Sequence, residues 1–108
     1  MDKDTMTILE WVDSASLSRT KKNLARDFSD GVLLAELLKI HIPQFVDIHN
    51  YITSSNSKQK LANWLLLNKK VLNKIGYNLS NDEIELLMNA KNNYIEQVLK
   101  GIYHIVNF

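Results

Sequence analysis

The sequence lacks cysteine altogether, and among its 108 residues it has one proline and three glycines. The absence of cysteine excludes disulfide bonds, thiolate metal sites and cysteine nucleophiles, and it is compatible with a reducing compartment. No apolar run approaches the roughly 20 residues that a membrane-spanning helix needs. The first residues, MDKDTMT, also lack the basic and apolar regions of a secretion signal. We therefore expect a soluble protein of the cytoplasm that makes no contact with a membrane.

Strand-like alternation, internal repeats and glycine-rich phosphate loops are missing from the sequence as well. Hydrophobic residues make up 45% of the chain and charged residues 23%, which is typical of a globular protein. A chain of this length supplies one compact core. We therefore predict a single all-α domain over residues 1–108, with its core at about residues 5–107.

The most strongly helical stretch is residues 58–75, which we predict to be the central core helix. Its core-facing stripe, at i, i+3, i+4 and i+7 spacing, consists of Leu61, Trp64, Leu65, Asn68, Val71, Leu72 and Ile75. Leu66 and Leu67 fall outside this stripe, and we expect other helices to cover them rather than a partner protein. Ser57 is the predicted N-cap, and Gly76 is the predicted left-handed residue that ends the helix.

Two helices are predicted before this stretch, one over residues 5–14 and one from Ser29 or Asp30 to Ile42. Pro43 ends the second helix, and Gly31 in its first turn suits the close approach of another backbone. From the apolar spacing of the three helices, we predict as core anchors Trp11, Leu34, Leu37, Leu61, Trp64, Leu65 and Leu72.

Between and after these helices the pattern is more broken. Residues 44–56 show no sustained period, so we predict an ordered loop with one helical turn. Ser80 and Glu83 are spaced as a capping box, with Leu79 packing on Ile84, and they predict a short helix to about Ala90. A last helix begins at about residue 93. The prediction is thus about four main helices, with short helical turns, around a central one.

No constellation of residues supports catalysis or a bound cofactor. His41, His49 and His104 are far apart in the sequence and form no metal-binding spacing, so we interpret them as packing or surface residues. Asp27 and Asp30 supply too few oxygen ligands for a hard cation, and they lie where helix caps are needed. We therefore predict a protein that is not an enzyme, with no catalytic residue, no metal and no cofactor.

Positive charge is concentrated in two segments, although the net charge is only +1. Residues 16–26 contain no acid and four bases, which are Arg19, Lys21, Lys22 and Arg26. Residues 57–76 contain five lysines and no acid, and Lys69, Lys70 and Lys74 lie toward the exposed arc of the predicted helix. The helical lysines are equally well explained as a solvated face, whereas a basic connector favours an acidic partner. The near-neutral total disfavours nucleic acid.

Several blocks of the sequence resemble a known family. The segment LSRTKKNLARDFSDGVLLAELL at residues 17–38 is similar to calponin-homology domains, in which an Asp-Gly pair precedes a leucine-rich helix. Together with HNY at residues 49–51, NSKQKLANW at 56–64 and LNKKVLNKIGY at 67–77, it resembles the subfamily of sperm flagellar protein 1, also called CLAMP. The resemblance covers about residues 8–106.

The resemblance implies a microtubule-binding module of cilia, flagella and related arrays. It implies a role in binding the acidic tubulin surface for Arg19, Lys21, Lys22 and Arg26, and secondarily for Lys69 and Lys70. Thr20 stands where this family has a proline before the Lys-Lys pair. Members typically continue into a C-terminal coiled coil, which this sequence does not include, so we expect a monomer.

Two other functions stay open. The fold also binds filamentous actin, usually as two domains in tandem, and one domain is predicted here. An adaptor that contacts a protein partner through apolar surface, without binding either filament, is the other alternative. Its binding would depend little on salt.

Overall fold

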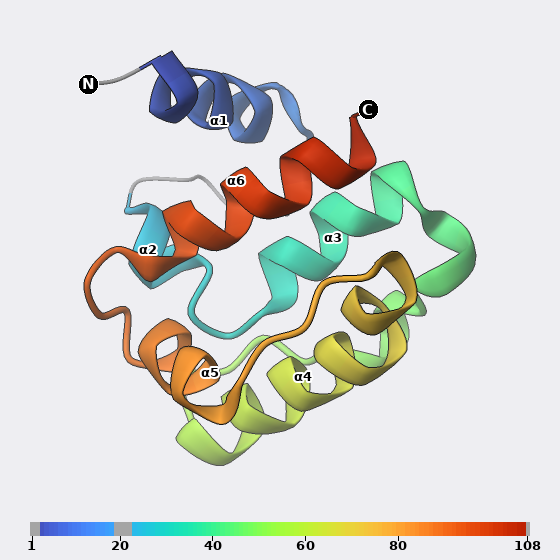
Figure 1. Cartoon of the computed structure of the whole chain (residues 1–108). Coiled ribbons are helices and arrows are strands. Elements are labelled where there is room, and N and C mark those ends of the chain that lie inside the picture. Colours follow the sequence, from blue (N-terminus) through green and yellow to red (C-terminus); the bar gives the residue numbers. More distant parts are fainter. Residues whose placement is uncertain (1–2, 19–22, 108) are drawn as a thin grey trace.

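The computed structural model describes residues 3–18 and 23–107, and within them it contains helices and no strand (Figure 1). The α-helices are α1 (Lys3–Ser14), α2 (Leu24–Asp27), α3 (Val32–His41), α4 (Ser57–Lys70), α5 (Asn81–Met88) and α6 (Tyr94–Val106). The short 3-10 helices are η1 (Pro43–Phe45), η2 (Ile48–Asn50) and η3 (Leu72–Ile75). The predicted all-α class is confirmed. No helix in this part of the chain is long and apolar enough to cross a bilayer.

The helix predicted over residues 58–75 is in fact two elements. The α-helix ends at Lys70, because Val71 leaves helical geometry at φ −121° and ψ −61°, and the chain continues as η3. Gly76 then ends η3 in the left-handed conformation, as predicted, with φ 81°. At the other end the N-cap is Asn56 rather than Ser57, because the Asn56 side chain accepts hydrogen bonds from the amides of Lys58 and Gln59.

The prediction of which face of α4 is buried was partly wrong. Trp64 and Leu67 are fully buried, whereas Leu61 and Leu65 are 41% and 45% exposed. The first half of α4 is apolar over most of its circumference, so its sequence alone does not specify the inward direction. The packing of the chain at Ser29–Gly31 against Trp64 rotates Leu61 and Leu65 toward the surface, and they are not core anchors.

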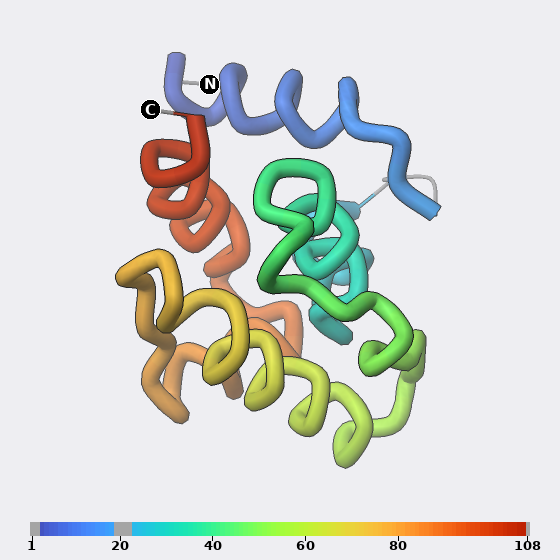
Figure 2. Tube along the Cα trace, turned by 90° about the vertical axis from the view of Figure 1, so that its right-hand side faces the viewer, coloured from blue at the N-terminus to red at the C-terminus, as the bar shows by residue number. Residues whose placement is uncertain are grey.

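The centre of the fold is α3 rather than α4. Six of its ten residues are buried, including the predicted anchors Leu34 and Leu37, because the run VLLAELL is apolar on nearly every side. Figure 2 shows α3 enclosed by α1 above, α4 below and α6 alongside. This helix begins two or three residues later than predicted, because Gly31 has a positive φ of 79° and the Asp30 carboxylate caps the amide of Val32.

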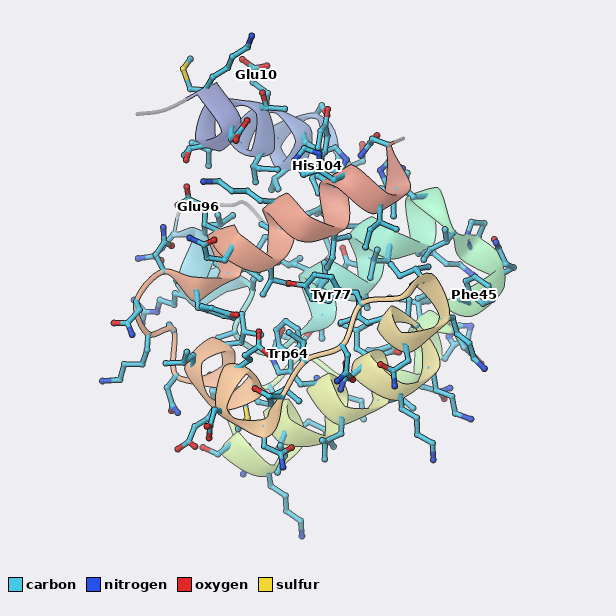
Figure 3. The ribbon with its side chains drawn as sticks, viewed as in Figure 1. Glu10, Phe45, Trp64, Tyr77, Glu96 and His104 are labelled. Carbon is cyan, nitrogen blue, oxygen red and sulfur yellow. The ribbon has the colours of Figure 1, made fainter. Side chains whose placement is uncertain are left out.

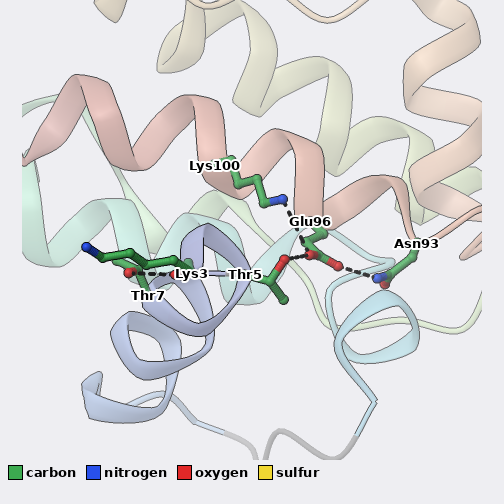
Figure 4. Close-up of polar contacts among 6 residues, drawn as sticks. All are labelled: Lys3, Thr5, Thr7, Asn93, Glu96 and Lys100. Carbon is green, nitrogen blue, oxygen red and sulfur yellow. Dashed lines mark hydrogen bonds and ion pairs between the residues drawn. The ribbon is translucent and has the colours of Figure 1, made fainter. Parts of the chain in front are cut away.

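The N-terminal helix packs on α6 and on the end of α3. Ile8 and Val12 are buried there, and the half-buried indole of Trp11 donates a hydrogen bond from Nε1 to Nε2 of His41 at 3.0 Å. The Trp11 ring also meets Tyr103 edge-on, with 5.0 Å between ring centroids. At the far end of α1, the Thr5 hydroxyl donates to the Glu96 carboxylate, which also pairs with Lys100 (Figure 4).

The short helix α5 begins as its sequence predicts. The Ser80 hydroxyl accepts a hydrogen bond from the Glu83 amide, and the Glu83 carboxylate accepts one from the Ser80 amide, which completes the capping box. Leu79 and Ile84, the predicted hydrophobic pair, are both buried. The Tyr94 hydroxyl also donates to Glu83, so the capping box connects α5 to the start of α6.

Candidate functional site

The structure describes the residues on either side of the central part of the basic connector, residues 19–22. Arg19, Lys21 and Lys22 lie outside the described residues. Before them, Ser18 donates from its amide and its hydroxyl to the Glu36 carboxylate on α3, at 2.7 and 2.6 Å. After them, Asn23 caps α2, because its side chain accepts a hydrogen bond from the Arg26 amide. Polar contacts therefore hold both flanks of the connector.

Arg26 is the base of the connector that falls within the residues that the structure describes. It is exposed on α2 beside a polar hollow of about 470 Å³. The hollow is lined by Arg26, Asp27, Ser29, Asp30, Thr53, Ser54, Ser55 and Lys60. The Lys60 ammonium donates a hydrogen bond to the Ser29 hydroxyl at 3.1 Å. The fold thus brings Arg26 and Lys60, from segments distant in the sequence, to one place.

Lys60 was not among the predicted site residues. It is the fourth residue of α4, and the local sequence indicates only a helical lysine. Its proximity to Arg26 arises from tertiary packing, so spacing along the chain contains no signal for it.

A buried polar network adjoins the hollow through Asp30 and Ser54, which line it. Asp30, which is 2% exposed, accepts hydrogen bonds from the amides of Val32 and Ser54. Asn63, which is 1% exposed, donates to the carbonyls of Asp30 and Ile52, each at 2.8 Å. These bonds fix the Asp30 corner, the loop at residues 52–54 and α4 relative to one another. These buried hydrogen bonds therefore help to fix the relative position of Arg26 and Lys60.

The packing of Trp64 explains why a glycine follows Asp30 at the start of α3. The Trp64 indole lies at the centre of the molecule (Figure 3) and donates from Nε1 to the Ser29 carbonyl at 2.8 Å. A Cβ atom on Gly31 would meet the Trp64 ring at 3.4 Å, and its φ of 79° would strain any other residue. Gly31 therefore permits close approach, as predicted, but to an aromatic ring rather than to a backbone.

Lys69 and Lys70 lie away from this hollow, in the last turn of α4. Figure 1 shows α2 and the C-terminal end of α4 on opposite sides of the molecule. Both lysines are exposed, and Lys70 borders a separate hollow of about 230 Å³ beside Tyr51. Burial and the nearby Asp47 carboxylate raise the pKa of Tyr51 to about 12. The structure thus separates the two groups of predicted site residues.

The histidines occupy three different environments. His41 accepts the hydrogen bond from Trp11, while His49 and His104 are exposed. Across residues 3–18 and 23–107, no three histidine, aspartate or glutamate side chains are grouped so that they could hold a metal ion.

In comparisons with known proteins, the matching family model and the similar relatives point to the same family. The family model described as "CH-like domain in sperm protein" matches residues 8–104. Sperm flagellar protein 1 of Xenopus laevis is 46% identical over 102 residues, which cover 94% of this chain and 44% of that protein. Sperm flagellar protein 1 of Mus musculus and of Homo sapiens are 47% and 44% identical over 89 residues, covering 82% of this chain and 38% of each protein. The chain therefore spans about two fifths of the length of these relatives.

Proposed function

The chain belongs to the family of CH-like domains in sperm protein, and from this membership we propose that it is a cytoskeletal module that binds the microtubule lattice. The observation that carries the proposal is the 46% identity, over 94% of the chain, to a protein named for the sperm flagellum, an organelle built on microtubules. We place the protein accordingly in cilia, flagella or another microtubule array. We also propose that residues 1–108 act as one monomeric domain.

The binding surface that we propose is the basic connector together with the rim of the polar hollow. It comprises Arg19, Lys21, Lys22, Arg26 and Lys60. Arg26 and Lys60 support this choice because they share one hollow, although the connector and α4 are separate in the sequence. Lys69 and Lys70, on the other side of the molecule, are proposed as secondary contacts with a neighbouring part of the lattice.

Electrostatic attraction explains how such a surface would select its partner. The outer face of polymerised tubulin and its tails are acidic, so the connector at residues 16–26, which has four bases and no acid, is steered toward it. Exposed charges interact over a Debye length of about 8 Å at physiological ionic strength, and over longer distances at low salt. Binding should therefore weaken as salt rises.

Co-sedimentation with stabilised microtubules, and in parallel with actin filaments, tests the proposal at low and at physiological ionic strength. We expect the protein to pellet with microtubules only. The double substitution Lys21→Glu/Lys22→Glu should abolish pelleting and leave the helical circular-dichroism spectrum unchanged. The matched control Lys74→Glu/Lys91→Glu makes the same change in net charge at two exposed lysines outside the proposed surface, and it should still pellet.

Three results would contradict the proposal in different ways. If the Lys21/Lys22 variant pellets like the unmodified protein, the connector is not the binding site. Pelleting with actin alone would identify the other filament bound by this fold. If the protein stays in the supernatant with both filaments at low salt, the basic residues are only a solvated face and the adaptor function is favoured.

A further inference from the structure

A third hollow lies between α4 and α5, and it shares no lining residue with the other two. Its volume is about 530 Å³, within the range of protein binding sites. It is lined by Ser57, Leu61, Leu65, Asn81, Ile84, Glu85, Met88 and Asn89. We call this hollow the α4–α5 groove. Its floor contains Leu61 and Leu65, the two leucines that the sequence predicts to be buried and that the structure exposes.

The α4–α5 groove is long enough to accept about two turns of a helix. Ser57, Leu61 and Leu65 follow one another at intervals of four residues, so the α4 side of the groove is about 12 Å long, or roughly two helical turns. Two hydrogen bonds between the Asn68 side chain and the backbone of Leu79 hold the start of α5 against α4. Both walls are therefore fixed helices whose rows of side chains can interdigitate with those of a third helix.

The two rims of the groove carry opposite charges. On the α4 side, Lys58 lies one turn before Leu61, and Lys69 lies one turn after Leu65. On the α5 side, Asp82 and Glu85 are one turn apart. All four charged side chains are exposed, and none makes a hydrogen bond or ion pair with another residue of the described chain. Their charges are available to a partner.

We propose that the α4–α5 groove binds an amphipathic helix of a partner protein. The helix would present an apolar stripe to Leu61, Leu65 and Met88, with acidic residues along the flank that faces α4 and basic residues along the flank that faces α5. The apolar contacts supply affinity, and the charged flanks fix the direction in which the helix lies. A second copy of this domain fits less well, because it would set one concave face against another.

Synthetic peptides test the proposal directly. The first peptide, of about 14 residues or nearly four turns, carries leucines at i, i+3, i+4 and i+7, glutamates along one flank and lysines along the other. The second has the same composition, with glutamates and lysines intermixed on both flanks. Fluorescence anisotropy of labelled peptides should show saturable binding of both, with the first at least about threefold tighter at low salt, a modest margin expected of exposed charges.

Two variants of the protein locate the binding. Leu61→Ser/Leu65→Ser removes exposed apolar side chains and should weaken binding of the first peptide at least about tenfold, since the floor of a groove supplies most of its affinity. The matched control Met6→Ser/Ile40→Ser removes slightly more exposed apolar side chains elsewhere, at 50% and 54% exposure, and should bind normally. Asp82→Lys/Glu85→Lys should remove the preference for the first peptide over the second.

Each contrary result overturns a defined part of the proposal. Absence of saturable binding, or equal binding by the Leu61/Leu65 variant, would show that the groove is not a helix site. Equal affinity of the two peptides would show that the charged rims do not contribute to recognition of the helix. If sedimentation shows a dimer of the protein that the Leu61/Leu65 substitutions dissociate, a second copy is the occupant instead.

Discussion

The substitution Asn63→Ala should destabilise the fold far more than its conservative appearance suggests. The Asn63 amide donates to the carbonyls of Asp30 and Ile52, and its oxygen accepts from the Ile52 amide at 3.3 Å and from the Gln59 side chain at 2.9 Å. This one side chain therefore connects α4 to the corner that precedes α3 and to the loop before α4.

The size of the effect follows from the groups left behind. An alanine leaves the buried Asp30 carbonyl without the Asn63 donor, and such an orphaned polar group costs about 1–3 kcal/mol. Water can partly solvate the two exposed groups of Ile52, so we assign them about 1 kcal/mol together. The expected loss is about 3 kcal/mol in the free energy of unfolding, or roughly 12 °C in Tm for a domain of this size.

Urea unfolding followed by circular dichroism at the helical band measures this loss. The matched control is Asn89→Ala, which removes an exposed asparagine side chain whose Nδ2 donates to the Glu85 carbonyl. We expect the control to cost about 0.5 kcal/mol, as surface substitutions do. If both variants lose the same small amount, the Asn63 network does not hold these elements together.

Two further substitutions test other contacts. Gly101→Ala should lower Tm, although alanine favours helices by about 1 kcal/mol, because its Cβ would lie 2.7 Å from Cε2 of Tyr77; a higher Tm would contradict the packing. Hydrogen bonds from the Tyr94 hydroxyl and the Ser80 amide hold the pKa of Glu83 below its usual 4.5. Because this pKa is lower in the folded state, the carboxylate stabilises the fold above pH 4.5 and loses that contribution as pH falls through the folded pKa. The unfolding free energies of the unmodified protein and of Glu83→Gln should therefore converge in acid, and a difference independent of pH would refute this role.

Local sequence signals predicted the features that depend on neighbouring residues. The capping box at Ser80 and Glu83 and the left-handed Gly76 each rest on hydrogen bonds within a few residues, so their patterns are nearly sufficient. The N-cap of α4 was displaced by one residue because Asn56 and Ser57 are both good caps and only one has the required extended backbone.

Features that depend on distant residues were not predictable in the same way. Nothing in the sequence of α4 says that Asn63, a polar residue, faces the core, because its partners at Asp30 and Ile52 come from other segments. Once Asn63 and Trp64 face inward, Leu61 and Leu65 must face outward. The inward packing of Asn63 and Trp64 therefore explains both why Leu61 and Leu65 were wrongly predicted to be buried and why the α4–α5 groove exists.

The same rotation of α4 gives the helix two separate surfaces. Consecutive residues of an α-helix point about 100° apart, so Lys60 borders the polar hollow while Leu61 opens into the α4–α5 groove. Hydrogen bonds from Asn63 to the Asp30 carbonyl and from Trp64 to the Ser29 carbonyl hold α4 in this orientation. The residues that line the two hollows differ, so a filament on the Lys60 side and a partner helix on the Leu61 side would share only Lys69, the rim lysine that is also proposed as a secondary filament contact. It follows that Leu61→Ser/Leu65→Ser should weaken peptide binding at least about tenfold and leave microtubule pelleting unchanged, whereas Lys21→Glu/Lys22→Glu should abolish pelleting and leave peptide binding unchanged.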